Sequence, residues 1–490
     1  MKSSNNFKEG LKGTTLLGGV QIYKILISVL RSKVLAIFLG PAGVGVLGLL
    51  NSTVDFIYGL TNFGLGTSAI RDISQADSEG DLYKLSFVSS VFKKLVWMTG
   101  FIGVAICVFL SPFWSFISFK NDNYTITIMI LSIAVIAKLL SEGQNSLMQG
   151  THNMRLMAKS NIWGNTLGLV ITIPLYFYYG IEAVGPALVL AYLMMLCVSW
   201  YYSHKIKLIK IKVTFRDALL KGRDMARFGT LIALSGLLSV GVSYLVRIYV
   251  GRTGGLTDVG LYVAGFSMVT TYVDMIFTGM GTEYFPRLAS KVNDKEAFHQ
   301  AINEQMQISI LLVAPLICIF LIFSKVAILI LYTEDFLGIE EMLCFAILAI
   351  LFKAPSWCCS YAILSKGDSK IFFGTEFALL AVMLPVNLFL YSLLGLKGLG
   401  IAYIVMYAYY LLQEWMVCKK CYGFGISQEV IMLYLPHLLL AVLCLITVSF
   451  FDGVSRYLWG LLFIFVDMIF SYRKLNEKID VLSFIKSIIK

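Results

Sequence analysis

Leu131-Ser-Ile-Ala-Val-Ile-Ala-Lys138-Leu-Leu-Ser141 is an apolar stretch with one lysine near its end, and Ala346-Ile-Leu-Ala-Ile-Leu-Phe-Lys353-Ala-Pro-Ser356 repeats the pattern 215 residues later. The same offset relates Gly64-Leu65-Gly66-Thr67 to Gly279-Met280-Gly281-Thr282. It also relates shorter matches: Val44-Gly45 and Val259-Gly260, Gly180 and Gly395, Gly185 and Gly400, Tyr192 and Tyr407, Trp200 and Trp415. Because a lysine, a tryptophan and a four-residue motif keep one frame, the sequence predicts two copies of one unit, each with a buried cation.

The composition of the chain is that of a protein built for lipid. Of 490 residues, 58% are hydrophobic and only 14% are charged, and the mean hydropathy is +0.79. A soluble protein carries about 25% charged residues. Apolar stretches of 18 residues or more are long enough to cross a bilayer core of about 30 Å. We predict fourteen spans, at approximately 14–38, 43–70, 85–112, 124–148, 157–179, 183–203, 228–250, 258–285, 303–332, 340–364, 371–394, 398–418, 430–451 and 456–472.

The basic residues predict the orientation of these spans. Most of the 40 lysines and arginines lie in the two tails and in alternate loops, whereas the opposite loops hold only Lys120, Arg252, Lys397 and Arg456. This asymmetry follows the positive-inside rule if both termini are cytoplasmic. The net charge of +11 is then explained by topology and by anionic lipid headgroups, and it is no evidence for nucleic acid.

A basic loop at about 204–227 separates the first six spans from the next six. Because six is even, the second copy enters the membrane in the same orientation as the first, as in parallel transporter repeats. We therefore predict an all-α integral membrane protein with two parallel six-helix lobes around a central cavity and two appended helices. The expected domains are 1–225 (spans one to six), 226–425 (spans seven to twelve) and 426–490, which holds spans thirteen and fourteen and a basic cytoplasmic tail.

Several features argue against an enzyme or a metal protein. The longest external loop, near Phe113–Tyr124, offers only Lys120 and Asp122 as charged groups. The four histidines, His152, His204, His299 and His437, are far apart. Cys418-Lys-Lys-Cys421 has no second cysteine or histidine pair, so it does not predict a metal site. We expect no catalytic site, no metal and no cofactor.

Polar stripes mark the leading helix of each copy. Gln21, Lys24, Ser28 and Arg31 share one face of span one, and Ser235, Ser239, Ser243 and Arg247 share one face of span seven. A charge at the bilayer centre costs roughly 2.5–3.5 kcal/mol on insertion scales, so these cations need water or partners. Two interpretations stay open at this point.

The first interpretation is structural, because acids inside the bundle can neutralise the bases. Glu142 lies one helical turn after Lys138, whereas Lys353 has no acid within a turn of its own helix. Asp55, Asp274 and Glu283 are further partners, and the same three acids are our candidates for ion coupling. The second interpretation is a water-filled cavity lined by five bases that bind an anionic cargo: Lys24, Arg31, Lys138, Arg247 and Lys353.

Two stretches carry a resemblance to a known family. Arg31-Ser-Lys33-Val-Leu-Ala-Ile-Phe-Leu-Gly40-Pro41-Ala-Gly43-Val-Gly45, followed by Asn62-Phe-Gly64-Leu-Gly66, resembles the opening of polysaccharide-export flippases of the Wzx type. Asp258-Val-Gly260-Leu-Tyr262 and Glu283-Tyr-Phe-Pro286-Arg287 resemble the start of their second lobe. The resemblance covers spans one to twelve. Its motifs identify the multidrug/oligosaccharidyl-lipid/polysaccharide exporter superfamily well and the cargo poorly.

The resemblance implies a flippase that moves an undecaprenyl-pyrophosphate-linked oligosaccharide, such as an O-antigen unit, from the cytoplasmic to the periplasmic leaflet by alternating access. It further implies a bacterial inner membrane, lipid contacts, and a polysaccharide polymerase and a chain-length regulator as partners. The alternatives are a multidrug or toxin antiporter of the same superfamily, a polysaccharide polymerase or ligase, an uncoupled lipid scramblase, and a flippase for a different polyprenyl-linked glycan. Span one has three bases and no acid, which favours an anionic cargo over a cationic drug.

Overall fold

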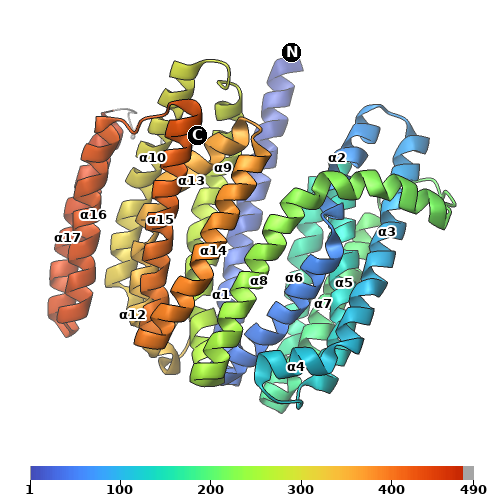
Figure 1. Ribbon diagram of the computed structural model, residues 1–490, viewed down its shortest axis with the longest axis horizontal. Helices are drawn as coiled ribbons and strands as arrows, with labels where there is room; N and C mark the ends of the chain where they lie inside the picture. The colour runs from blue at the N-terminus through green and yellow to red at the C-terminus, as the bar shows by residue number, and fades with distance from the viewer. Residues whose placement is uncertain (1, 478–490) are drawn as a thin grey trace. The chain divides into compact units, whose positions relative to one another are not determined.

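The computed structural model describes residues 2–477, with side chains from residue 23 onward except at 24, 215–232, 272, 273 and 282. This part of the chain folds into α-helices joined by short connections and contains no strand (Figure 1). It forms two compact units. Unit 1 consists of Met1–Gly260 with Leu331–Thr333, and unit 2 consists of Leu261–Ile330 with Glu334–Lys490.

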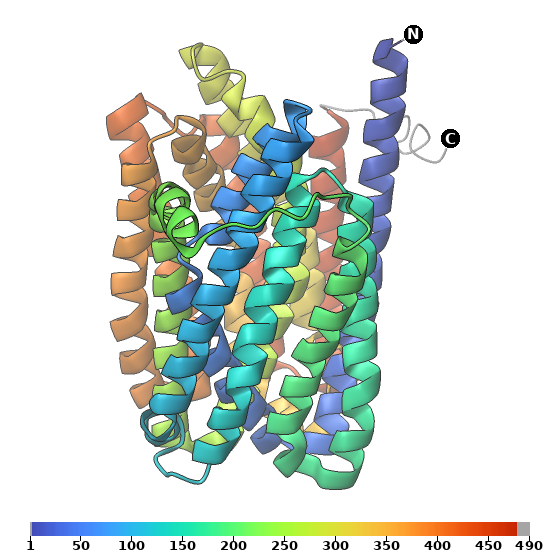
Figure 2. The same ribbon diagram turned by 90° about the vertical axis from the view of Figure 1, so that its right-hand side faces the viewer.

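Unit 1 is built from the first helices of the chain, drawn from blue to green in Figure 1. They are α1 (Lys2–Asn62), α2 (Leu65–Ser78), α3 (Leu82–Phe109), α4 (Ser111–Phe119), α5 (Thr125–Gly150), α6 (Met154–Tyr179), the 3-10 helix η1 (Gly180–Ala183), α7 (Val184–Ser203) and most of α8 (Phe215–Met268). Within the unit, α5 packs against α3 and α7, and α6 packs against α7, so these helices run side by side (Figure 2).

Unit 2 contains the remaining helices. They are the π-helix η2 (Val269–Val273), α9 (Asp274–Ala289), α10 (Lys295–Ile322), α11 (Ser324–Leu331), the 3-10 helix η3 (Glu334–Ile339), α12 (Glu340–Leu348), α13 (Ile350–Ser365), α14 (Ser369–Leu394), α15 (Leu396–Tyr422), α16 (Gln428–Phe450) and α17 (Gly453–Asn476). Helix α15 packs against α12, α13 and α14, and α16 and α17 pack against α10.

Two glycines divide the longest helices. Gly40 has φ 59° inside α1, and Gly255, which lies 215 residues later, has φ 83° inside α8. Positive φ values are open to glycine and strained for other residues. Pro41 follows the first break and is compatible with the first turn of the next helical segment. The repeat therefore sets the same backbone break in both long helices.

A second glycine pair allows α1 and α8 to approach closely. A Cβ on Gly260 would lie 1.7 Å from the Pro41 carbonyl oxygen, and a Cβ on Gly45 would lie 2.0 Å from the Leu256 carbonyl oxygen. Both distances are far inside van der Waals contact. Gly45 and Gly260 belong to the repeated Val-Gly motif, so this part of the repeat serves helix packing.

The helices confirm an all-α multi-pass membrane protein. In the described part of the chain, ten helical runs are long and apolar enough to cross a membrane. Three of them, Ile25–Asn62, Met154–Ser203 and Ala233–Ala289, each hold two predicted spans. The predicted span at 340–364 is formed by α12 and α13, which meet at Ala349. The central cavity between lobes, the domain boundaries and the cytoplasmic termini stay predictions.

The distribution of side chains suits a lipid environment. Phe109 and Phe450 are 81% and 80% exposed, whereas Asn145, Ser356 and Asn387 are buried. This reverses the arrangement of a soluble protein. Small and polar side chains inside a bundle hold membrane helices together, and apolar side chains face the lipid.

A buried arginine fixes the start of α17. Arg456 is 1% exposed, and its guanidinium donates hydrogen bonds to the carbonyl oxygen of Ile322 at 2.9 Å and to Glu340 Oε1 at 2.7 Å. It also donates to Ser324 Oγ at 2.8 Å. The sequence places Arg456 in an external loop, whereas the structure uses it to satisfy the carboxyl end of α10.

Candidate functional site

The first repeated lysine forms an ion pair in unit 1. Lys138 on α5 pairs with Asp55 on α1, and its ammonium lies 4.9 Å from the ring centre of Tyr58 and 5.7 Å from that of Tyr192. Lysine and aspartate side chains are 20% and 30% exposed. The partner is therefore Asp55 on another helix, and not Glu142, which the sequence offered one turn away on α5.

The second lysine has an equivalent environment in unit 2. Lys353 on α13 pairs with Asp274, the first residue of α9, and its ammonium lies 5.4 Å from the ring centres of both Phe277 and Tyr407. Lys353 has no acid on its own helix nearby, but the fold supplies one from α9. Both lysines thus have carboxylate partners, as the structural interpretation of the sequence requires.

The two sites show how the repeat has diverged. Lys138 and Lys353 keep the offset of 215, as do Tyr192 and Tyr407, but the counterpart of Asp55 in that frame is Thr270. Asp274 lies four residues, or about one helical turn, further on. The π-helix η2 immediately precedes Asp274 and changes the helical register there. An offset search alone misses the repeated acid for this reason.

Arg31 is the predicted site residue that has no acidic partner among the described side chains. It lies on the second half of the first predicted span and lines a cavity of about 150 Å³ in unit 1, between α1, α6 and α7. Asn51, Asn165, Thr172 and Tyr176 contribute polar groups to the same cavity. An unpaired guanidinium beside amides and hydroxyls is suited to bind an anion.

Hydrogen bonds connect this cavity to the Lys138 ion pair. Tyr192, which also lines the cavity, donates to Asn51 Oδ1 at 2.9 Å, and Asn51 Nδ2 donates to Asp55 Oδ2 at 3.2 Å. Arg31 and Lys138 therefore belong to one polar network inside unit 1. An anion at Arg31 would act on the Lys138–Asp55 pair through Asn51 and Tyr192.

The other two predicted bases differ from Arg31. Arg247 on α8 donates to the Ser52 hydroxyl of α1, and its Nε is buried without a hydrogen-bond partner. The Lys24 side chain, like that of Gln21 in the same stripe, lies outside the described residues.

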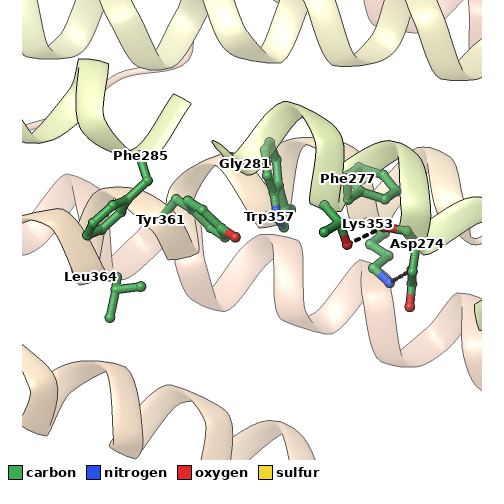
Figure 3. A pocket seen from close by; sticks show the side chains of 9 residues that line it. Asp274, Phe277, Gly281, Phe285, Lys353, Trp357, Tyr361 and Leu364 are labelled. Atoms are coloured by element: carbon green, nitrogen blue, oxygen red, sulfur yellow. Dashed lines mark hydrogen bonds and ion pairs between the residues drawn. The ribbon is translucent and has the colours of Figure 1, made fainter. Parts of the chain in front are cut away.

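A larger cavity of about 560 Å³ lies in unit 2 (Figure 3). The Lys353–Asp274 pair stands at one end, and Phe285 and Leu364 stand at the other. The lining residues are Asp274, Phe277, Thr278, Gly281, Phe285, Lys353, Trp357, Tyr361 and Leu364. Ligand pockets commonly measure about 300–1,000 Å³ and combine apolar walls with a few polar groups, so this cavity has the size and lining of a binding site.

The three acids predicted to couple ions all lie beside bases. Asp55 and Asp274 pair with the two lysines, and Glu283 Oε1 lies 2.9 Å from Arg287 Nε on the next turn of α9. Glu283 is 66% exposed. Their role in coupling stays a prediction. In the described part of the chain, no group of three or more His, Cys, Asp or Glu residues is placed to hold a metal ion.

Sequence reasoning missed two buried polar groups. Glu376 on α14 and Glu414 on α15 lie close together in unit 2, and Glu414 is fully buried. His437 on α16 and Asp467 on α17 are also fully buried and are joined by a hydrogen bond of 2.6 Å. Each of these four residues is an intramembrane ionisable group in the sequence, and such groups are functional candidates in themselves.

The fold places the protein in a class of transporters. A multidrug resistance MATE family transporter of the MOP superfamily, in an inward-facing conformation, superposes with a TM-score of 0.68 at 15% identity, over 82% of this chain and 94% of that one. The lipid II flippase MurJ, in an inward closed conformation, superposes with a TM-score of 0.65 at 14% identity, over 94% of this chain and 99% of that one. The chain thus has the fold shared by these proteins.

The sequence identifies the family within that class. The profile of the family described as "Polysaccharide biosynthesis protein" matches residues 34–341, so the chain belongs to this family. It is similar to a Shigella flexneri protein named "Putative O-antigen transporter", with 23% identity over 406 residues that cover 81% of this chain and 94% of the relative. The resemblance to polysaccharide-export flippases is confirmed.

Proposed function

We propose that the protein is a flippase for an undecaprenyl-pyrophosphate-linked oligosaccharide, an O-antigen-like repeat unit that it moves from the cytoplasmic to the periplasmic leaflet. Membership of the polysaccharide biosynthesis family and the similarity to an O-antigen transporter support this cargo class. The structural observation that carries the proposal is Arg31, a guanidinium without an acidic partner beside a polar cavity in unit 1.

Arg31 fits the diphosphate of such a cargo. Guanidinium groups bind phosphate oxygens through two parallel, charge-assisted hydrogen bonds. The 150 Å³ cavity is below the usual range for whole ligands, so it suits a headgroup and not an oligosaccharide. We assign the diphosphate to Arg31, with Lys24 and Arg247 as further bases on the leading helices of the two repeats.

The unit 2 cavity suits the sugar part of the cargo. Phe277, Phe285, Trp357 and Tyr361 offer aromatic faces, on which the apolar faces of sugar rings can pack. Thr278 and the Tyr361 hydroxyl offer hydrogen bonds to sugar hydroxyls. Its volume of about 560 Å³ is sufficient for part of a short oligosaccharide.

Lys138 and Lys353 can bind cargo only if a phosphate displaces their carboxylate partners. Each lysine already makes an ion pair, with Asp55 and Asp274 respectively, and each pair is partly exposed. A diphosphate carries more charge than a carboxylate and competes well for an ammonium group. We therefore propose that these pairs open when cargo arrives and close again after its release, as one step of alternating access.

The proposed setting is the bacterial inner membrane, with both termini cytoplasmic, as the distribution of lysine and arginine predicts. The partners are then the lipid-linked oligosaccharide, membrane lipids, and a polysaccharide polymerase and chain-length regulator that act on the product. Catalysis is no part of this proposal.

Cells that depend on this gene for surface polysaccharide test the proposal. Arg31→Gln, at wild-type membrane abundance, should lower surface polysaccharide strongly. Arg155→Gln removes an exposed arginine at the start of α6 and is the matched control. Undiminished polysaccharide with Arg31→Gln would show that the cationic-site mechanism is wrong.

A drug or toxin antiporter is the second candidate, because the unit 2 cavity combines four aromatic side chains with the carboxylate of Asp274. Such a lining also suits a flat aromatic cation. Resistance to ethidium conferred by expression of the gene, in cells whose polysaccharide does not depend on it, would favour this candidate over the flippase.

A further inference from the structure

Two carboxyl groups and a tyrosine form a cluster inside unit 2, away from the lysine ion pairs. Tyr410 on α15 donates a hydrogen bond of 2.5 Å to Glu376 Oε1 on α14, and its hydroxyl lies 3.1 Å from Ser360 Oγ on α13. Glu414, one turn after Tyr410, interacts electrostatically with both Glu376 and Tyr410. Three helices therefore contribute to the cluster.

Glu414 is the unusual member of this cluster. It is fully buried, and neither of its carboxyl oxygens has a hydrogen-bond partner in the described part of the chain. No described base forms an ion pair with Glu414 or Glu376. An ionised carboxylate without a partner is strongly disfavoured inside a membrane protein, and a second carboxyl nearby disfavours it further. Glu414 is therefore suited to hold a proton.

The titratable groups on the surrounding helices do not supply a counter-charge. Cys359 on α13 and Glu376 on α14 are the neighbours of Glu414 on those helices. On α12, Glu340 pairs with Arg456 and Glu341 pairs with Lys397. On α15 itself, the neighbour is Tyr410. All of these groups are neutral or acidic, so proton uptake is the available way to neutralise the site.

The repeat shows that the fold does not require these acids. In the frame of 215 residues, Glu376 corresponds to Asn161 and Glu414 corresponds to Ser199. Asn161 accepts a hydrogen bond from Asn145 at 3.4 Å, and Asn145 is the counterpart of Ser360. The same position in unit 1 is therefore polar but uncharged, and only the second copy has acquired a pair of carboxyl groups.

The cluster is linked to the unit 2 cavity through α13 and α15. Ser360, at the cluster, is followed directly by Tyr361, which lines the cavity. Tyr407 contacts Lys353 on one side and interacts electrostatically with Glu376 on the other. A change of charge in the cluster would thus be felt by the Lys353–Asp274 pair and by the cavity wall.

We propose that Glu376, Tyr410 and Glu414 form a proton-binding site that couples cargo movement to a proton gradient. A proton from water forms an O–H bond with a Glu414 carboxyl oxygen, and its release restores the carboxylate. Glu376 and the Tyr410 hydroxyl provide the neighbouring acceptor and donor. This inference rests on the proposed transport function, but proton binding itself can be measured without cargo.

Infrared spectroscopy of the full-length protein in liposomes tests the site directly. A protonated carboxylic acid has a C=O stretching band that a carboxylate lacks. At neutral pH the wild type should show such a band, and Glu414→Gln, a neutral variant of nearly the same shape, should lose it. Glu414→Ser copies the unit 1 residue Ser199 and should lose it as well. Glu182→Gln, at an exposed acid in η1, is the control that should keep it. A band of wild-type intensity in Glu414→Gln would overturn the proposal.

Transport in the same liposomes tests the coupling. A proton gradient of one pH unit should change the steady-state distribution of lipid-linked oligosaccharide by up to about tenfold per coupled proton. In Glu414→Gln, cargo should still equilibrate but no longer respond to the gradient. An unaltered response in Glu414→Gln would refute the coupling role. A wild type that shows the infrared band but moves no lipid-linked oligosaccharide would instead refute the proposed cargo, and leave the proton site supported.

Discussion

Arg31 should separate cargo binding from stability. Its guanidinium has no acidic partner among the described side chains and lines the polar cavity of unit 1. A hydrogen bond to a charged group contributes about 1.5–3 kcal/mol. Because 1.4 kcal/mol corresponds to a factor of ten, Arg31→Gln should weaken diphosphate binding by roughly 10- to 150-fold. It should leave the free energy of unfolding unchanged or slightly higher, since an unpartnered charge in an apolar span is unfavourable.

Lys353→Gln provides the comparison, because this lysine has a carboxylate partner. The variant leaves Asp274 without its base, so we expect it to lower the free energy of unfolding by about 1–3 kcal/mol. The assay is calorimetric binding of a short-chain polyprenyl pyrophosphate to the purified protein, with thermal unfolding measured on the same samples. The reasoning fails if Arg31→Gln lowers the unfolding temperature as Lys353→Gln does and leaves the affinity unchanged.

Three further predictions concern stability. Arg456→Met should cost about 3–5 kcal/mol, because it leaves Glu340 and the end of α10 without their partner; a thermal unfolding temperature equal to that of the wild type would contradict this. His437→Leu alone should destabilise the protein in the same assay, whereas the double variant with Asp467→Leu should recover much of the loss, since a buried pair can be replaced by apolar residues; equal losses would argue against a paired role. Gly260→Ala should lower the yield of folded protein in detergent because its Cβ meets Pro41, and Gly236→Ala, with nothing within 4 Å, is the control that should not.

The fold could be predicted from the sequence because membrane spans depend on composition over many residues. Each predicted span coincides with a helix, and the offset of 215 gives matching breaks at Gly40 and Gly255. Hydrophobicity fixes the helices, and glycine fixes the breaks, so neither depends on distant contacts.

The partners of the buried bases could not be predicted in the same way. Asp55 and Lys138 are 83 residues apart in the sequence, and the fold alone brings them together. Glu142 was the better candidate by helical spacing, but its distance in sequence said nothing about the acid on α1. In the second copy, the π-helix before Asp274 also moved the acid out of the repeat frame.

Glu414 shows a different limit. The sequence reveals an acid in an apolar span, but only the packing of α13, α14 and α15 shows that it is fully buried without a partner. Burial and neighbouring groups determine whether such a residue is a counter-charge or a proton site. The repeat then adds information, because unit 1 has Ser199 at the equivalent position.

Reconstitution with defined cargo tests the central claim most directly. The purified protein is placed in liposomes that contain a fluorescent undecaprenyl-pyrophosphate-linked oligosaccharide on one leaflet, and the fraction reached by a quencher on the opposite side is followed over time. The wild type should transfer the lipid-linked oligosaccharide, and Arg31→Gln should transfer it much more slowly at equal protein density. Liposomes in which the wild type moves ethidium but leaves the lipid-linked oligosaccharide on its original leaflet would contradict the account.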